Sequence, residues 1–279
     1  MAQGVAVLLL AATSLVPPAG AAPCELEAGE TLQVADVIDG DTVLLDDGRE
    51  VRLTGIQAPK LPLGRAGFEA WPLADEARDV LVELAGKKAV TLRYGGARID
   101  RHNRILAQLF VTSGGETYWL QQEMLRRGLA RVYTFSDNRA CDEELLSAER
   151  TARAEGRGIW SNPFYAVRDA ADVSALERQT GRFELVEGEV VSAALVRGRL
   201  YLNFGDDYRQ DFTVTAGERD AKLFLETEPW LLLSGAAGEE AASPLAGRKL
   251  RVRGWIERHN GPEIRVTHPE QIELLDKPE

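Results

Sequence analysis

The run from Val37 to Lys60, VIDGDTVLLDDGREVRLTGIQAPK, constrains the fold of this chain more than any other stretch. Within it, Asp39, Gly40 and Asp41 interrupt an alternation of apolar residues. The two carboxylates therefore fall where a strand leaves its register. Carboxylates in such a place suit a hard cation that takes oxygen ligands.

A tight hairpin is predicted directly after these acids. Residues 42–45 resume the strand, and Asp47-Gly48 is the dipeptide expected at a two-residue hairpin turn, so residues 50–56 are expected to run back beside them. Arg52 lies in this second strand. A strand position next to the acids lets its guanidinium meet a phosphate with two parallel hydrogen bonds.

Short runs spaced along the first half of the chain resemble the thermonuclease, or staphylococcal-nuclease-like, family. They are IDGDT, RLTGIQAP, DRHNR, GLARVY and GIW, and the resemblance covers about residues 32–163. It implies an OB-fold-type five-stranded barrel in a mainly β chain with helices (α+β). It also implies calcium as cofactor and DNA or RNA as the phosphodiester substrate or ligand.

The resemblance assigns roles to individual residues. Carried over position by position, it implies Asp41 as a calcium ligand, with Asp39 as a second candidate ligand. It implies Arg52 and Arg104 as the two arginines that bind the phosphate and stabilise the charge formed during hydrolysis.

Two positions depart from the family pattern. Lys60 stands where the family has the glutamate base, and Gln57 stands where it has an aspartate ligand for calcium. A carboxylate is able to take a proton at neutral pH, whereas lysine is charged and donates, and loss of a general base costs roughly 10²- to 10⁴-fold in rate. Gln57 removes a negative charge from the cation site, while Lys60 adds a candidate phosphate contact.

These departures leave the enzymatic activity open. One reading is an exported, metal-dependent phosphodiesterase of low activity, which uses another base such as Glu69. The alternative is a catalytically degenerate nuclease fold that binds nucleic acid or a protein partner in the envelope. His102 is interpreted as a loop residue and not as a catalytic one.

The charge balance is unusual for a nucleic-acid binder. The formal net charge is −11, and residues 23–165 alone hold 18 basic and 23 acidic residues. Phosphate affinity depends on lysine and arginine, so only local clusters of positive charge can support binding.

The N-terminal residues 1–21 have a short apolar core and end in small residues, which predicts a cleaved secretory signal peptide. A retained membrane-tethering helix is the alternative. We therefore expect an exported protein, periplasmic or secreted. Cys24 and Cys141 are the two cysteines of the mature chain, and an even count in an oxidising compartment predicts one disulfide between them.

The second half of the chain predicts a second domain. A nuclease-like domain is expected over 22–165, followed by a linker over 166–180 that is rich in Ala, Asp and Ser. Several short strands with one helix late in the order then predict a small OB-like β-barrel over 181–276. Its aromatic residues, such as Tyr201 and Phe204, alternate along strands and are interpreted as core.

Overall fold

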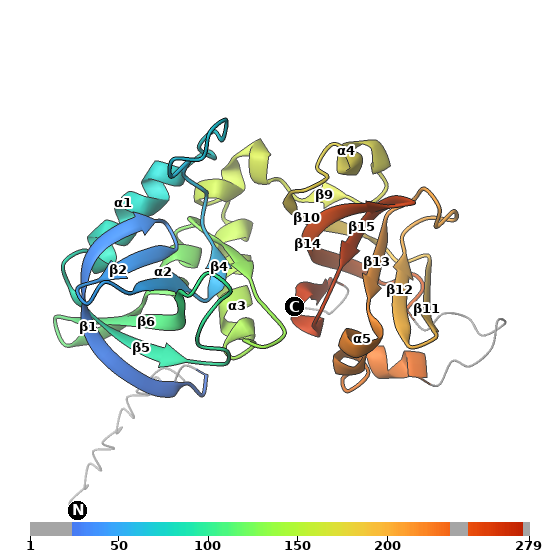
Figure 1. Ribbon diagram of the computed structural model, residues 1–279. Helices are drawn as coiled ribbons and strands as arrows, with labels where there is room; N and C mark the ends of the chain where they lie inside the picture. Colours follow the sequence, from blue (N-terminus) through green and yellow to red (C-terminus); the bar gives the residue numbers. More distant parts are fainter. Residues whose placement is uncertain (1–23, 235–244, 276–279) are drawn as a thin grey trace, which may run out of the picture.

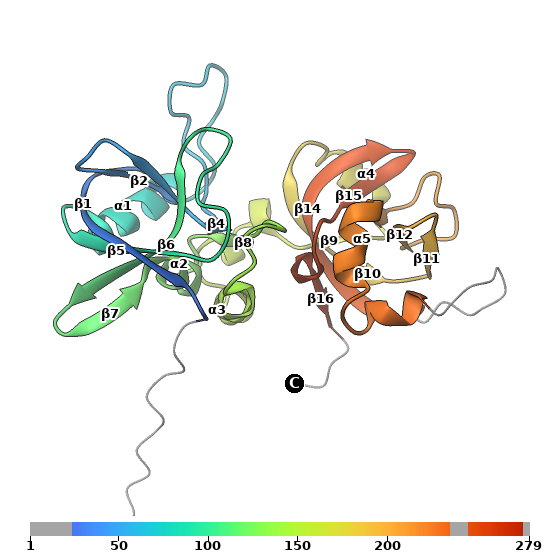
Figure 2. The same ribbon diagram turned by 60° about the horizontal axis from the view of Figure 1, so that its bottom comes forward.

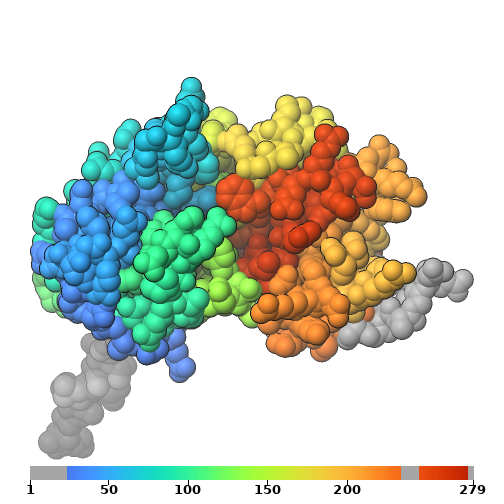
Figure 3. Space-filling model, viewed as in Figure 1, coloured from blue at the N-terminus to red at the C-terminus, as the bar shows by residue number. Residues whose placement is uncertain are grey.

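The computed structural model describes residues 24–234 and 245–275, so the predicted signal peptide lies outside the described residues. Figures 1 and 3 show two folded units side by side, the first formed by the N-terminal half of the chain and the second by the C-terminal half. No helix within the described ranges is long and apolar enough to cross a membrane.

The first unit is a closed five-stranded barrel with one additional strand. Five strands pair in the order β3-β2-β1-β5-β6, and a parallel pairing between β3 and β6 closes the ring. The additional strand, β7, extends the sheet from β6. The strands are β1 (Glu27–Asp39), β2 (Thr42–Leu45), β3 (Glu50–Leu53), β5 (Ala89–Tyr94), β6 (Ile105–Ser113) and β7 (Glu116–Trp119).

Three helices and a small second sheet complete this unit. The helices are α1 (Ala74–Ala85), α2 (Leu120–Arg126) and α3 (Asp142–Ala154). The short strands β4 (Gly55–Gln57) and β8 (Arg131–Tyr133) pair with each other beside the barrel. Because apolar residues alternate along the strands and recur at helical spacing in α1, one continuous core forms, with Val51, Leu81 and Leu109 fully buried in it. The turns η1 (Gly158–Ser161) and η2 (Pro163–Tyr165) follow α3.

The second unit has one mixed sheet with its own core. The strands are β9 (Arg168–Asp169), β10 (Phe183–Glu189), β11 (Ser192–Val196), β12 (Arg199–Asn203), β13 (Thr213–Ala216), β14 (Lys249–His259), β15 (Gly261–Arg265) and β16 (Ile272–Leu274). The helical segments are α4 (Val173–Glu177), α5 (Glu218–Phe224), η3 (Trp230–Ser234) and η4 (Pro269–Gln271).

The pairings of the second sheet follow the order seen in the first. They run β11-β12-β13-β15-β14-β10, with β13 and β15 parallel as β3 and β6 are in the first unit, and α5 lies between β13 and β14 in the chain. β10 and β11 are consecutive segments separated by Val190 and Val191, and no pairing joins them directly. The second OB-like barrel therefore stays a prediction. Phe204 lies in the core as expected, whereas Tyr201 is only partly buried and does not belong to the core.

The segment expected to be a linker has regular structure. Within residues 166–180, β9 pairs in parallel with β10, and Leu176 of α4 is fully buried in the second core. Ala and Asp are both depleted in strands, so this segment has little strand preference of its own. Its regular structure comes from the sheet on which it packs.

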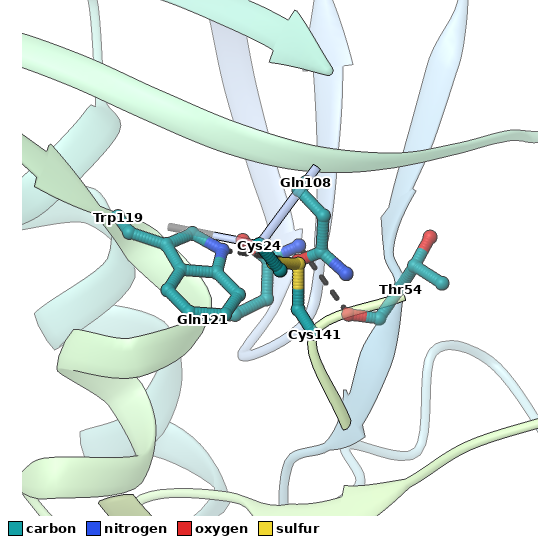
Figure 4. The surroundings of a disulfide bond; sticks show 6 residues. All are labelled: Cys24, Thr54, Gln108, Trp119, Gln121 and Cys141. Carbon is teal, nitrogen blue, oxygen red and sulfur yellow. Dashed lines mark hydrogen bonds between the residues drawn. A yellow bond between two sulfur atoms is a disulfide. The ribbon is translucent and has the colours of Figure 1, made fainter. Parts of the chain in front are cut away.

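A disulfide joins Cys24, just before β1, to Cys141 at the start of α3. Figure 4 shows it beside Trp119, Gln108 and Gln121. Trp119 Nε1 donates to Gln108 Oε1 at 3.0 Å, and Gln121 Nε2 donates to the Ala107 carbonyl at 2.9 Å. This buried polar group ties β6 to the start of α2, on the side of the barrel that the disulfide covers.

Polar side chains join the two units. Arg253 of β14 is 1% exposed and forms an ion pair with the buried Glu149 of α3 at 3.0 Å. Arg139 pairs with Glu270, and Thr134 Oγ1 lies 2.7 Å from His268 Nε2. Figures 1 and 2 show α3, and Figure 2 shows β8, on the side of the first unit that faces the second. The interface is therefore held by charged and polar contacts with little exposure to solvent.

Candidate nucleic-acid site

Backbone irregularities at the end of β1 create the acidic turn. The β1–β2 register shifts between Val37 and Asp39, where the predicted strand break falls. Gly40 is required by space, because a Cβ atom there would lie 2.7 Å from the Cβ of Ala58 and 2.8 Å from the Cβ of Ala77. The close approach turns Asp39 and Asp41 inward, where both are buried.

Asp41 is the most heavily bonded residue of the site. Its Oδ2 accepts from the Ala58 amide at 2.7 Å, and its Oδ1 accepts from the Thr42 hydroxyl at 3.2 Å. Burial alone raises the pKa of Asp41, but the charges of Arg52 and Lys60 outweigh it and hold that pKa well below its usual range. Asp41 is therefore an anion at any pH near neutrality.

Lys60 lies directly on the two acids. Its Nζ contacts both oxygens of Asp41, at 2.8 and 2.7 Å, and Oδ2 of Asp39 at 3.4 Å. Its side chain is 21% exposed. Burial and the neighbouring charge of Asp41 raise the pKa of Asp39, and Lys60 and Arg52 oppose that rise.

Arg52 forms its hydrogen bonds within the site, mainly to main-chain carbonyls. Its Nη1 donates to the carbonyls of Leu53, at 2.8 Å, and Asp41, at 3.2 Å, while its Nη2 donates to the Ile56 carbonyl at 2.6 Å. Nη2 also pairs with Asp41 Oδ2 at 3.2 Å. Arg52 is thus beside the acids, as expected, but its terminal nitrogens hold the turn between β3 and β4 and do not point to a free phosphate position.

Gln57 is turned toward the second unit. Its Oε1 accepts from Nη2 of Arg131 at 2.9 Å, and both side chains are buried. Arg131 in turn lies over the ring of Phe183 in β10. Sequence reasoning missed Arg131, which is 74 residues away from Gln57; the only signal was its position in the GLARVY run.

The other predicted residues lie apart from the acids. Arg104 precedes β6 and pairs with Asp100 at 2.7 Å, and it contacts neither Asp39 nor Asp41. Because Leu106 pairs with Arg52, Arg104 lies two positions along the same face of the barrel wall. Its side chain is 28% exposed, so it is available to a ligand.

His102 and Glu69 are both exposed on loops. His102 Nε2 accepts from the neighbouring Arg101, consistent with a loop residue. Glu69 belongs to the loop after β4, which projects from the barrel in Figures 1 and 2. No contact joins it to the acids within the described residues.

The side chains present do not fit the calcium ion that the family resemblance implies. Calcium takes six to eight oxygen ligands. Here both Asp41 oxygens and one Asp39 oxygen face the Lys60 ammonium, and the Gln57 oxygen is taken by Arg131. Two acids already face two cations, so their formal charges cancel without a metal.

Comparisons with known proteins decide the family. Residues 50–162 match the family model described as staphylococcal nuclease homologue. The chain is 30% identical over 136 residues to a thermonuclease of Staphylococcus hyicus, which covers 48% of this chain and 77% of that protein. The chain belongs to the staphylococcal nuclease family. It is also 34% identical over 121 residues to a probable endonuclease, lcl3, of Pyrenophora tritici-repentis, and spans 41% of the length of that fungal relative.

This membership confirms the resemblance seen in the sequence and the barrel it implies. The comparisons support a nuclease. The residues matched by the family model, 50–162, lie in the first unit.

Proposed function

We propose that this chain is a slow nuclease that binds the phosphodiester backbone of DNA or RNA at the mouth of the first barrel. The observation that carries the proposal is the cluster of Asp41, Arg52 and Lys60 within a barrel of the nuclease family. Arg104, two positions away on the same wall, supplies an accessible guanidinium for the phosphate.

The chemistry open to these residues is charge stabilisation. In phosphodiester hydrolysis, negative charge grows on the phosphate oxygens, and fixed cations close to those oxygens lower the barrier. The partly exposed cations are the ammonium of Lys60 in the cluster and the guanidinium of Arg104 further along the barrel wall. Since these cations belong to the chain, hydrolysis as proposed here does not require calcium.

Asp39 is the carboxylate best suited to accept a proton from water. The contacts of its oxygens are the Asp41 amide at 3.1 Å and Lys60 at 3.4 Å, both longer than the closest contacts of Asp41. Burial raises its pKa, which increases its affinity for a proton. With a lysine at the usual position of the base, turnover is expected to be slow.

Cleavage and binding are to be measured together. Labelled single-stranded DNA, double-stranded DNA and RNA are incubated with excess protein, with calcium and with chelator, and the same samples are run in a gel shift. Arg104→Gln should weaken binding roughly 10- to 100-fold, because it removes a charged hydrogen-bond donor. Arg126→Gln, on an exposed arginine of α2, is the matched control.

A second candidate function is binding without turnover, and the lysine at position 60 favours it. A gel shift that depends on Arg104, with no cleavage of any substrate, would support this candidate. The absence of both a gel shift and cleavage would overturn both candidate functions.

Export remains part of the proposal. The disulfide between Cys24 and Cys141 supports it, because such bonds persist in oxidising compartments. Fractionation of cells that express the full chain should place the mature protein outside the cytoplasm. Recovery of the uncleaved protein in the cytoplasm would contradict this.

A further inference from the structure

We infer that the ammonium of Lys60 is the resident cation of this site, and that a calcium site is latent beneath it. The inference rests on the proposed function only in the location of the site, and not on turnover. It assigns to one side chain the place that a divalent ion would take between Asp39 and Asp41.

The geometry of the contact supports this assignment. An ammonium group has three donors, and three carboxylate oxygens lie around the Lys60 nitrogen at 2.7, 2.8 and 3.4 Å. Two of these oxygens belong to Asp41, whose side chain is 0% exposed. One ammonium thus bridges the two acids, in addition to the contact of Arg52 with Asp41.

Buried carboxylates of this kind need a cation. An unpaired buried charge is strongly unfavourable, so each of these carboxylates requires a positive group beside it. Arg52 pairs with Asp41 Oδ2 only, because its other donors bond to main-chain carbonyls. Removal of the Lys60 charge would leave two carboxylates against one guanidinium.

The backbone holds Lys60 in this place. The Ala58 amide donates to Asp41, and the Lys60 carbonyl accepts from the Trp71 amide at 2.9 Å, so both sides of the lysine are anchored. Pro59 fixes the backbone between them. The Lys60 ammonium therefore belongs to a backbone segment that is held on both sides by hydrogen bonds.

The test is calcium binding by purified, chelator-treated protein in the absence of nucleic acid, followed by calorimetric titration. The unmodified chain and Lys60→Arg should show no binding at this site. Lys60→Met and Lys60→Gln should bind one calcium ion with a dissociation constant of roughly 10⁻⁴ to 10⁻³ M. Lys222→Met, on an exposed lysine of α5, should behave as the unmodified chain does.

Two results would overturn the inference. One is calcium binding by the unmodified chain that is as tight as that of Lys60→Met and is lost in Asp41→Asn. The other is folded Lys60→Met or Lys60→Gln that does not bind calcium. If both uncharged variants fail to fold in chelator, calcium should restore their folding, and failure to restore it counts against the latent site.

The outcome is independent of the nuclease assay, since no nucleic acid is present. Absence of cleavage by the unmodified chain would remove the proposed function and leave the resident cation intact. Calcium binding by the unmodified chain would remove the assignment of Lys60 as the resident cation and leave the proposed function intact.

Discussion

Lys60 and Asp41 show how one residue changes the chemistry of a familiar turn. The IDGDT run supplies the acids and the hairpin supplies Arg52. Lys60, two residues after Ala58, then pairs with both acids. Buried ion pairs contribute little net stability compared with apolar side chains, whereas loss of one partner is costly. The acids and Lys60 are therefore expected to depend on each other.

The pH dependence of folding should report this pairing. The pKa of Asp41 is depressed in the folded state, so its contribution to stability is present above its unfolded pKa, about 3.9, and is lost as the pH falls below that value. Lys60→Met removes part of the depression and should lose less stability on acidification. Urea unfolding between about pH 5 and 3 measures the difference. Equal pH dependence in both proteins would show that Lys60 does not hold the Asp41 charge.

Some of this site could be predicted from the sequence. Asp39, Asp41 and Arg52 were expected together because a hairpin brings neighbouring strands side by side, and they do lie together. The phosphate-binding geometry of Arg52 was expected too, but its nitrogens bond to carbonyls of the β3–β4 turn. Such contacts depend on the path of the backbone after the strand, which local pattern does not fix.

At the scale of elements, the spacing of apolar residues accounts for the two longest helices of the first unit. Residues 73–84 and 142–155 have apolar side chains at helical spacing, and α1 and α3 match them closely. The sequence gives no signal for β11, because its residues are partly or fully exposed and show no apolar alternation. The pairing of β9 with β10 depends on a partner almost 20 residues ahead, so composition alone suggested a linker.

The disulfide links two elements that are far apart in sequence. Cys24 and Cys141 are separated by 117 residues, and closing a loop of this size removes much entropy from the unfolded chain. Replacing both by serine should lower the free energy of unfolding by about 2–5 kcal/mol. Urea unfolding of the double variant against the oxidised parent measures this loss. No change in the midpoint would mean that other contacts hold the start of β1 and the start of α3 in place without the disulfide.

At the scale of the whole molecule, the interface should make the two units unfold together. Arg253 contacts Glu149 of the first unit and Glu273 of the second, and all three are buried. Arg253→Met removes the fully buried partner that Glu149 and Glu273 share, although Arg153 still contacts both carboxylates, and should cost up to about 3–5 kcal/mol. Differential scanning calorimetry should show one transition for the parent, moved to lower temperature in the variant. Two separate transitions in the parent would contradict a shared interface.

Two titratable groups at this interface have opposite effects. Burial raises the pKa of Asp142 to about 8, and both its oxygens lack a hydrogen-bond partner. Burial lowers the pKa of His268 to about 4. The neighbouring charges are Arg139, Glu270 and Arg253. Asp142 thus favours folding at low pH, whereas His268 favours it at high pH.

Together, Asp142 and His268 predict how the free energy of unfolding changes with pH. From about pH 4 to 6.5 they cancel, because the folded state keeps the Asp142 proton while the unfolded state binds the His268 proton. From about pH 6.5 to 8 only Asp142 contributes, so stability should fall by roughly 2 kcal/mol. Asp142→Asn should abolish this fall, as measured by urea unfolding. A parent whose stability is flat above pH 6.5 would show that Asp142 is ionised.

The most direct measurement is cleavage of labelled single-stranded DNA by Lys60→Glu, compared with the unmodified chain, with calcium and with chelator. Lys60→Glu removes the resident ammonium and places a carboxylate at the position where the family resemblance implies the base. We predict a rate increase of roughly 10²- to 10⁴-fold that requires calcium. A rate equal to that of the unmodified chain, or an increase that chelator does not remove, would contradict the assignment of Lys60 as the cation of this nuclease site.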